Sequence, residues 1–367
     1  MRMSMITLCL ACVVVGCVTQ PVDTDSFQVT TITESLSSPW GMDFLDETTL
    51  IVTQKSGVLS FVDLQSGAIT DIRGVPQVVS SGQGGLLDVA LVDNWVYLTY
   101  SASYDGGVTT HLARARLVDT HLEELEVLYR ASPALSGGAH FGSRVLVVDD
   151  YVFLSTGDRG EKNFGPDHVS QDTSNTLGSI IRMYRNGSIP QDNPFVGNPD
   201  VVDSIYTFGH RNVQGMTLHP DTQEIWISDH GEQDGDEISV LEAGGNYGWP
   251  IVHYGCTYVL GRPIGGFAHE RDDIVNPVFY WECGSGGFPP AGMTFYSGDV
   301  FPHWQGDLFV GGLAKRYLAH FSVENGVVSE NEPLLADRGW RIRDVMQGPE
   351  GYMYVLTDGG GLYRLSP

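Results

Sequence analysis

The sequence is poor in positive charge. Its 367 residues include only 20 lysines and arginines against 45 aspartates and glutamates, which gives a formal net charge of −25. A protein that binds nucleic acid needs basic surfaces for the phosphates, so this balance argues against nucleic acid as a partner. The acidic residues are scattered rather than clustered, which is typical of a well-solvated surface. The placement of each arginine is therefore informative.

The sequence also lacks long hydrophobic runs. The most apolar stretch, residues 6–15, follows Arg2 and is too short to span a bilayer, as in a secretion signal. It ends in "VVGC", which resembles the signal of bacterial lipoproteins, in which the cysteine is lipidated and becomes the mature N-terminus. We therefore expect a signal peptide over residues 1–16, a lipidated Cys17 and a tether to residue 28. An ordinary signal peptide with an incidental cysteine is the alternative.

The lipoprotein signal predicts where the protein is located. We expect an exported protein, periplasmic or at the cell surface, that is anchored in the outer membrane only through its lipid. Cysteine is scarce, with five in the chain, and Cys9 and Cys12 would leave with the signal. Cys256 and Cys283 then remain as an even pair in an oxidising compartment, which predicts a disulfide. Metal binding by the two cysteines is the weaker alternative.

Glycine, by contrast, is abundant, with 45 residues, and suits a chain of many tight turns. Six stretches repeat one pattern, in which an alternating strand, a turn with Gly, Asp, Asn or Pro, and a second strand follow one another. No amphipathic helix of normal length interrupts the series. The repeats predict an all-β fold, a six-bladed β-propeller over residues 29–367, with a β-sandwich as the alternative. They begin at Trp40, Gly84, Gly142, Gln214, Ala291 and Ile342.

Equivalent loops of a propeller meet around the central channel, so residues at the same point of each repeat become neighbours. Several polar residues stand where the first strand of a repeat begins. Arginines match carboxylates bidentately, amides fix orientation and a histidine offers a base, so this ring predicts a pocket for a planar, multiply anionic ligand. Taken singly, each residue also has a purely structural explanation. The ring contains Gln83, His140, Arg211, Asn212, Arg341 and Arg343.

Ordered motifs between about residues 38 and 365 give the sequence a family resemblance. They include "GQGGLLDVAL", "HFGSR", "STGDRG", "IYTFGHRNVQGM", "HGEQDGDEI", "GGNYGWP" and "RIRDV". The chain resembles the soluble aldose dehydrogenases that depend on pyrroloquinoline quinone (PQQ), the glucose/sorbosone dehydrogenase family. The resemblance implies a six-bladed propeller that uses PQQ and Ca²⁺ to oxidise the anomeric hydroxyl of an aldose to a lactone.

The resemblance also implies roles for the ring. It makes His140 the general base and places Arg211 where it stabilises developing negative charge. Asp158 and Arg159 would instead fix the connection that follows, residues 161–180, over the pocket rim. The residues expected to contact the cofactor are Gln83, Asn212, Arg341 and Arg343.

Metal ligands follow from the same resemblance. Backbone oxygens of Asp234 and Gly235 would hold Ca²⁺, and a second calcium would use Glu237 with the carbonyl of Tyr247. A local capping or pairing role for Glu237 is the alternative. Two positions depart from some family members, because Ala139 and Ala314 stand where those members have an aspartate and a cofactor-binding lysine.

Two alternative functions of a six-bladed propeller would use chemistry different from that of the dehydrogenase. A calcium-dependent lactonase would need inward carboxylates holding a metal that activates water. A propeller without catalysis would serve as a binding module. For the dehydrogenase, the expected partners are an aldose and an electron acceptor that the sequence does not identify, and the protein would be a monomer or a dimer.

Overall fold

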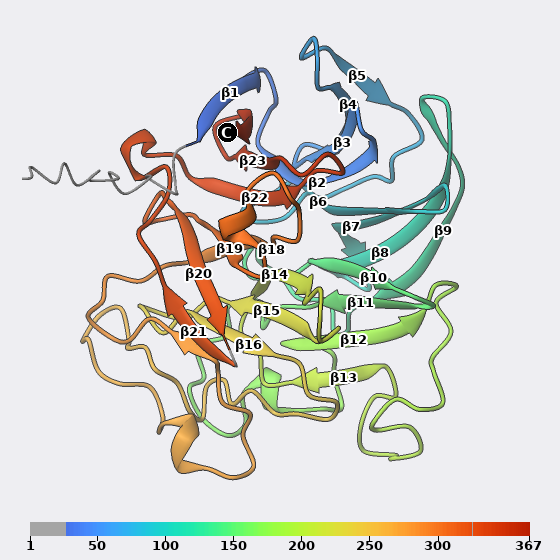
Figure 1. Ribbon diagram of the computed structural model, residues 1–367. Helices are drawn as coiled ribbons and strands as arrows, with labels where there is room; N and C mark the ends of the chain where they lie inside the picture. The colour runs from blue at the N-terminus through green and yellow to red at the C-terminus, as the bar shows by residue number, and fades with distance from the viewer. Residues whose placement is uncertain (1–26, 325) are drawn as a thin grey trace, which may run out of the picture.

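The computed structural model describes residues 27–324 and 326–367. The predicted signal peptide and Cys17 lie outside these residues. The described chain forms six four-stranded antiparallel sheets around a central channel (Figure 1). The six-bladed β-propeller predicted from the repeats is thereby confirmed. Within residues 27–324 and 326–367, no helix combines the length and the apolar character needed to cross a membrane.

The first three blades follow one another along the chain, each running from the channel outward. Blade one contains β2 (Pro39–Asp46), β3 (Thr49–Gln54), β4 (Val58–Asp63) and β5 (Ile69–Ile72). Blade two contains β6 (Leu86–Val92), β7 (Trp95–Tyr104), β8 (Gly107–Val118) and β9 (His121–Arg130). Blade three contains β10 (Val145–Val148), β11 (Tyr151–Ser155), β12 (Ser179–Tyr184) and β13 (Ile205–Phe208).

The remaining blades complete the circle. Blade four contains β14 (Val213–Leu218), β15 (Ile225–Asp229), β16 (Glu237–Val240) and β17 (Phe279–Tyr280). Blade five contains β18 (Pro290–Phe295), β19 (Leu308–Gly312), β20 (Leu318–Glu324) and β21 (Val327–Glu330). Blade six contains β22 (Ile342–Gln347), β23 (Met353–Thr357), β24 (Leu362–Ser366) and β1 (Gln28–Thr33). Four short 3₁₀ helices lie in connections: η1 (Val169–Gln171), η2 (Ala268–Glu270), η3 (Pro302–Trp304) and η4 (Ala336–Arg338).

Each sequence repeat supplies the two innermost strands of one blade. In blade three, β10 and β11 pair from Val145 opposite Leu154 to Val148 opposite Tyr151, across the Asp149-Asp150 turn. The inner strands contact one another in the order β2, β6, β10, β14, β18, β22 and back to β2. The loops that precede these strands therefore meet around one channel, as the repeats predicted.

The circle is closed by the two ends of the described chain. β1 pairs antiparallel with β24, with Gln28 opposite Ser366 and Thr31 opposite Tyr363. The outer strand of blade six therefore comes from the N-terminal side of the chain and its three inner strands from the C-terminal side. Because this pairing joins the first and last segments, it removes the open edge that a linear array of blades would leave.

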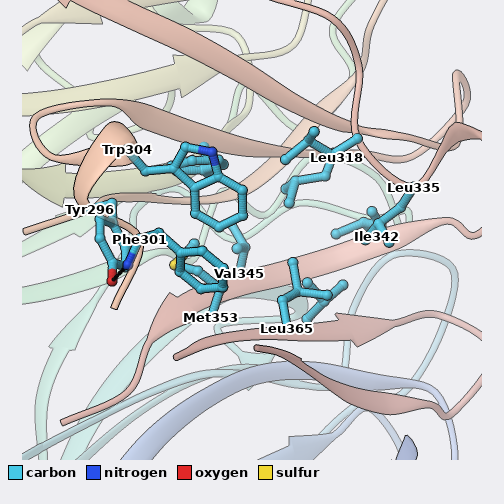
Figure 2. Packing of buried hydrophobic residues seen from close by; sticks show 12 residues of the cluster. Tyr296, Phe301, Trp304, Leu318, Leu335, Ile342, Val345, Met353 and Leu365 are labelled. Atoms are coloured by element: carbon cyan, nitrogen blue, oxygen red, sulfur yellow. Dashed lines mark hydrogen bonds between the residues drawn. The ribbon is translucent and has the colours of Figure 1, made fainter. Parts of the chain in front are cut away.

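The hydrophobic core lies between neighbouring blades rather than in one central mass. Figure 2 shows the cluster between blades five and six, in which Trp304 and Phe301 stack with ring centroids 4.1 Å apart. Ile342, Val345 and Met353 of blade six pack against them, all fully or almost fully buried. Similar clusters fill the spaces between other blades. Each blade therefore contributes an apolar face to the core on each of its two sides.

The centre of the channel is polar. The guanidinium of Arg144 lies 2.9 Å from a carboxylate oxygen of Asp88 and 3.3 Å from one of Asp344, so one cation joins blades two, three and six. Glycines make room for the acids, because a Cβ atom at Gly292 would overlap the Asp344 carboxylate. One buried arginine cannot neutralise two buried carboxylates, so burial raises the pKa of Asp88 to about 7 even beside Arg144.

Candidate active site

Two adjoining cavities open at the end of the channel where the inner strands begin. They share Gln83 and His230, and their volumes are about 320 and 330 Å³. The first, here called the basic cavity, is lined by Lys55, Arg341 and Arg343 with Asp358 as the single acid. The second, here called the acidic cavity, is lined by His140, Arg211, Glu232, Asp234 and Asp236, among others. The two cavities together offer one polar space with opposite charge at its two ends.

His140 reaches the acidic cavity from the loop before β10. Its backbone is held at φ 45°, in the left-handed region that residues other than glycine rarely adopt. Its N–H donates to the side-chain oxygen of Gln83 at 2.8 Å, which fixes this conformation across two blades. Two residues predicted separately from the sequence, Gln83 and His140, are therefore in direct contact.

Asp158 is the partner of the His140 ring. Nδ1 of His140 and a carboxylate oxygen of Asp158 lie 2.6 Å apart, and Asp158 is completely buried. The same carboxylate accepts hydrogen bonds from the Trp249 indole N–H at 2.9 Å and the Gly160 N–H at 2.8 Å. Burial alone would raise the pKa of Asp158, but the hydrogen bond from His140 and the charges of His140 and Arg211 hold it below its usual value.

Asp158 was expected to fix the connection that follows, and it does lie 3.7 Å from Nε2 of His168 in that connection. Its pairing with His140 is a further role that the sequence did not predict. Because β10 and β11 form one hairpin, the turn after β11 returns to the loop before β10, and the two reactive ends of the hairpin meet. Arg159 has a structural role, but at the His140 loop and not at the connection where it was expected. Its guanidinium donates to the carbonyl oxygens of Ala139, Gly137 and Val108, and so holds the His140 loop in place.

Arg211 also lines the acidic cavity, and its carbonyl accepts a hydrogen bond from the Asp158 N–H at 2.9 Å. Its guanidinium lies 2.5 Å from Glu232, and Lys162 contacts the same carboxylate at 2.5 and 2.6 Å. These two cations outweigh the effect of burial and lower the pKa of Glu232. Lys162 belongs to the connection after β11, which reaches the cavity rim as predicted. Nε of Arg211 is buried and has no hydrogen-bond partner within the described residues.

Asn212 is fully buried and is not part of the cavity lining. Its side-chain oxygen accepts from the Gly142 N–H at 3.0 Å, just after the His140 loop. Its own N–H donates to Asp229 at 2.7 Å, as does that of Arg211 at 3.0 Å. Nδ2 of Asn212 is buried without a partner among the residues described. Asn212 therefore supports the loop that carries His140, and its cofactor contact remains a prediction.

Arg341 and Arg343 line the basic cavity together. Both pair with Asp358, at 2.9 and 2.7 Å, and Arg343 also donates to the side-chain oxygen of Gln214 at 2.9 Å. The two arginines lower the pKa of Asp358 despite its burial, so the carboxylate stays ionised and holds both guanidinium groups. The fixed pair is suited to carboxylates, which arginine binds through two parallel hydrogen bonds.

Lys55 is a third cation of the basic cavity, which the sequence had not indicated. It follows β3, and its ammonium donates to the Gly82 carbonyl at 2.8 Å. Burial and the positive charge of Arg343 lower its pKa. Ala314 lies in the acidic cavity, and Lys315 beside it instead donates to the Ser285 carbonyl at 3.1 Å. Some family members have a cofactor-binding lysine at the position of Ala314. In this chain, Lys55 supplies a lysine ammonium in the adjoining basic cavity instead.

The residues predicted to bind calcium lie in and near the turn after β15. Asp234 lines the acidic cavity, and its carboxylate accepts from the Gly284 N–H at 2.6 Å. Gly235 packs against His253 and Gly255, and its N–H donates to the Trp281 carbonyl at 2.6 Å. Glu237 begins β16, opposite Asp229, and burial together with nearby Asp229 and Asp236 raises its pKa well above the usual value.

Carboxylate and backbone oxygens suit a hard divalent cation, because oxygen ligands are what Ca²⁺ prefers. Tyr247, the other predicted ligand, stacks on His210 with ring centroids 4.4 Å apart. The cysteine alternative does not apply. Cys256 and Cys283 form a disulfide with an S–S distance of 2.05 Å, so neither offers a thiolate to a metal.

Comparison with known proteins places this geometry in a family. The sequence profile of the Glucose / Sorbosone dehydrogenase family matches residues 36–364. The chain belongs to this family. It is 37% identical to an aldose sugar dehydrogenase of Escherichia coli over 358 residues, which cover 92% of each protein. An uncharacterised protein of Synechocystis is 36% identical over 91% of this chain and 85% of its own length.

Solved structures agree with the fold. The apo-form crystal structure of the soluble aldose sugar dehydrogenase of Escherichia coli superposes with a TM-score of 0.84 at 35% identity. The match covers 93% of this chain and all of that one. The PQQ-bound aldose sugar dehydrogenase of Streptomyces coelicolor superposes with a TM-score of 0.75 at 24% identity, covering 93% and 98% of the two chains.

Proposed function

We propose that the protein is a PQQ-dependent dehydrogenase that oxidises the anomeric hydroxyl of aldose sugars to lactones. The observation that carries the proposal is the His140–Asp158 pair in a cavity that adjoins a second cavity with three cations. A base held by a buried carboxylate suits removal of a hydroxyl proton. A neighbouring cluster of guanidinium groups suits a flat ligand with several carboxylates.

The basic cavity fits the carboxylates of PQQ. Arg341, Arg343 and Lys55 would bind them, with Gln83 and Gln214 as orienting amides. The buried, unpartnered Nε of Arg211, which lines the adjoining acidic cavity, indicates that polar atoms of a ligand belong nearby. Backbone oxygens of Asp234 and Gly235 would hold one Ca²⁺, and Glu237 with the Tyr247 carbonyl would hold a second. When bound, the quinone supplies the acceptor for the hydride that leaves C1 of the sugar.

Residues at the acidic cavity would remove the proton of the C1 hydroxyl and stabilise the charges that result. Because Nδ1 of His140 donates to Asp158, Nε2 carries the lone pair and can accept the proton of the C1 hydroxyl. Asp158 then stabilises the imidazolium that forms. Arg211, which lines the same cavity, would stabilise negative charge that develops during the reaction. Each aldose gives up one proton to His140 and one hydride, and leaves as the lactone.

Reconstitution tests the proposal. The purified protein is titrated with PQQ with and without Ca²⁺, and a panel of aldoses is then offered with an artificial electron acceptor. We expect PQQ binding that needs Ca²⁺ and oxidation of aldoses to lactones. His140→Ala should keep PQQ affinity within a few-fold and lose on the order of 10²–10⁴ in turnover. Stoichiometric PQQ binding without oxidation of any aldose would reject the assignment, and cofactor-free lactone hydrolysis would favour the lactonase.

A further inference from the structure

The loop closed by the disulfide carries an unusual share of exposed apolar surface. Ten large hydrophobic side chains are exposed among residues 27–324 and 326–367, and five of them lie within residues 257–282, here called the disulfide loop. Val259 is 90% exposed, and its neighbours Tyr258 and Leu260 are 65% and 63% exposed. These three residues form the tip of the loop. Exposed apolar groups that gather in one place mark a site of interaction.

The tip is held in its exposed position. The Cys256–Cys283 disulfide closes the base of the loop, and the N–H of Cys283 donates to the Tyr254 carbonyl at 2.9 Å. The Tyr254 ring also stacks on Tyr280 with centroids 3.7 Å apart. At the tip, the N–H of Thr257 donates to the Arg262 carbonyl at 2.9 Å. A surface ordered in advance loses less conformational entropy when a partner binds.

The tip lies at the mouth of the acidic cavity. Tyr258 is one of the residues that line this cavity together with His140 and Arg211. The Lys162 ammonium, which contacts Glu232 in the same cavity, is 6.0 Å from the centre of the Tyr258 ring. In Figure 1 the chain between β16 and β17 forms the long yellow-to-orange loops at the lower left of the propeller. A partner bound at the tip would therefore stand beside the reacting centre.

The charge around the tip selects the kind of partner. The disulfide loop has four exposed acidic residues against two arginines, in a chain whose net charge is −25. An acidic surface attracts a basic protein and is repelled by an anionic membrane. Weak electron-transfer complexes bury small interfaces, so a short apolar tip with a charged rim is large enough for one. The four acids are Glu270, Asp272, Asp273 and Glu282.

We propose that the tip, Tyr258, Val259 and Leu260, is the docking surface for a basic one-electron carrier protein. The proposal rests on the dehydrogenase function proposed above. Oxidation of one aldose to its lactone releases two electrons and two protons. Two oxidised carriers must therefore bind in turn for each sugar, and each leaves with one electron. Docking at the cavity mouth brings the carrier to the electrons without entry into the cavity.

Direct binding tests the docking surface without the cofactor. The full protein is titrated by calorimetry with cytochrome c, a basic one-electron carrier, and with the same cytochrome after acetylation of its lysines. A Val259→Ser/Leu260→Ser variant should bind native cytochrome c about tenfold more weakly than the wild type. Val327→Ser changes an apolar residue on β21 that is 64% exposed, about as much as Leu260, and this variant should bind as the wild type does. Acetylated cytochrome and added salt should weaken binding to the wild type.

Two results would overturn the proposal. One is equal affinity of the tip variant, the Val327→Ser control and the wild type for native cytochrome c. The other is a tip variant that binds cytochrome normally but loses association with vesicles of phosphatidylglycerol and phosphatidylethanolamine, which would mark a membrane contact. Oxidation of an aldose with a small dye should be unchanged in the tip variant. Absence of dye-linked oxidation in every protein, the wild type included, would count against the dehydrogenase and not against docking.

Discussion

Replacement of Asp158 by asparagine tests the pairing on which the proposed chemistry depends. Asparagine has the same size, but it carries no negative charge, and its NH₂ group cannot accept the hydrogen bond from the Trp249 indole. In the wild type, His140 Nδ1 and the Asp158 carboxylate are 2.6 Å apart and buried, so water cannot replace Asp158 as the partner of Nδ1. The amide oxygen would take the position of the carboxylate oxygen that accepts from both His140 and Gly160, so this hydrogen bond would remain. The negative charge that stabilises the imidazolium would be lost, and His140 would be a weaker base for the sugar hydroxyl.

The expected loss of turnover in Asp158→Asn can be estimated from the role of Asp158 behind the histidine base. An orienting carboxylate behind a histidine base is worth on the order of 10²–10⁴ in turnover, or about 3–5 kcal/mol in the barrier. PQQ affinity should change little, because Asp158 does not line either cavity. The lost charge-assisted hydrogen bonds would also lower the free energy of unfolding by about 1.5–3 kcal/mol.

Steady-state kinetics at saturating PQQ and Ca²⁺ measures the effect, with a PQQ titration and thermal unfolding alongside. Asp149→Asn is the matched control, because Asp149 is an exposed residue at the turn of the same β10–β11 hairpin. It should keep wild-type turnover. If Asp158→Asn, folded and saturated with PQQ, turned over sugar within about threefold of the wild type, the orienting role would be refuted.

Three further changes probe the cofactor cavity, the channel and the anchor. Arg343→Ala should weaken PQQ binding about 10- to 100-fold, since it removes charge-assisted bonds, and excess PQQ should restore part of the turnover; an unchanged PQQ titration would contradict this. Asp88 has a folded-state pKa of about 7, which is above its value in the unfolded chain, so the folded protein binds a proton more tightly. The free energy of unfolding should therefore fall as pH rises from about 4 to 7, by at most about 4 kcal/mol. In denaturant titrations, Asp88→Asn should flatten this fall, and an unaltered pH profile would argue that Asp344 holds the proton. Cys17→Ser should abolish fatty-acid labelling of the exported protein, and an unlabelled wild type would disprove the lipoprotein signal.

Residues at equivalent points of the repeats could be placed from the sequence alone. His140, Arg211 and Arg343 stand where an inner strand begins, and a propeller brings such points to one end of the channel. Both cavities are lined by residues of this ring. Asn212 shows the limit of the inference, because a residue next to the ring can point beneath the cavity floor as easily as into it.

The residues that were missed lie at the other ends of hairpins. Asp158 follows the second strand of its repeat, and Lys55 stands in the turn between β3 and β4. Each is distant from the ring in the repeat pattern but adjacent to it in space, because antiparallel pairing returns the chain to where it began. Alternation of apolar and polar residues identifies a hairpin without stating which polar residues its two ends bring together. The pairing register and the approach of the Gly157 backbone to His140 decide that.

The few arginines in the channel are each paired with an acidic residue, and these pairs explain how a chain with little positive charge forms a basic cavity. Arg144, Arg211 and Arg343 each contact a buried or half-buried carboxylate, namely Asp88, Glu232 and Asp358. Without these partners, burial would disfavour the positive charges and leave the long side chains unordered. With them, the guanidinium groups are fixed before a ligand arrives, and the cost of ordering them is met during folding. An acidic chain can therefore present a rigid basic cavity, and the acids that surround each arginine are part of the binding site.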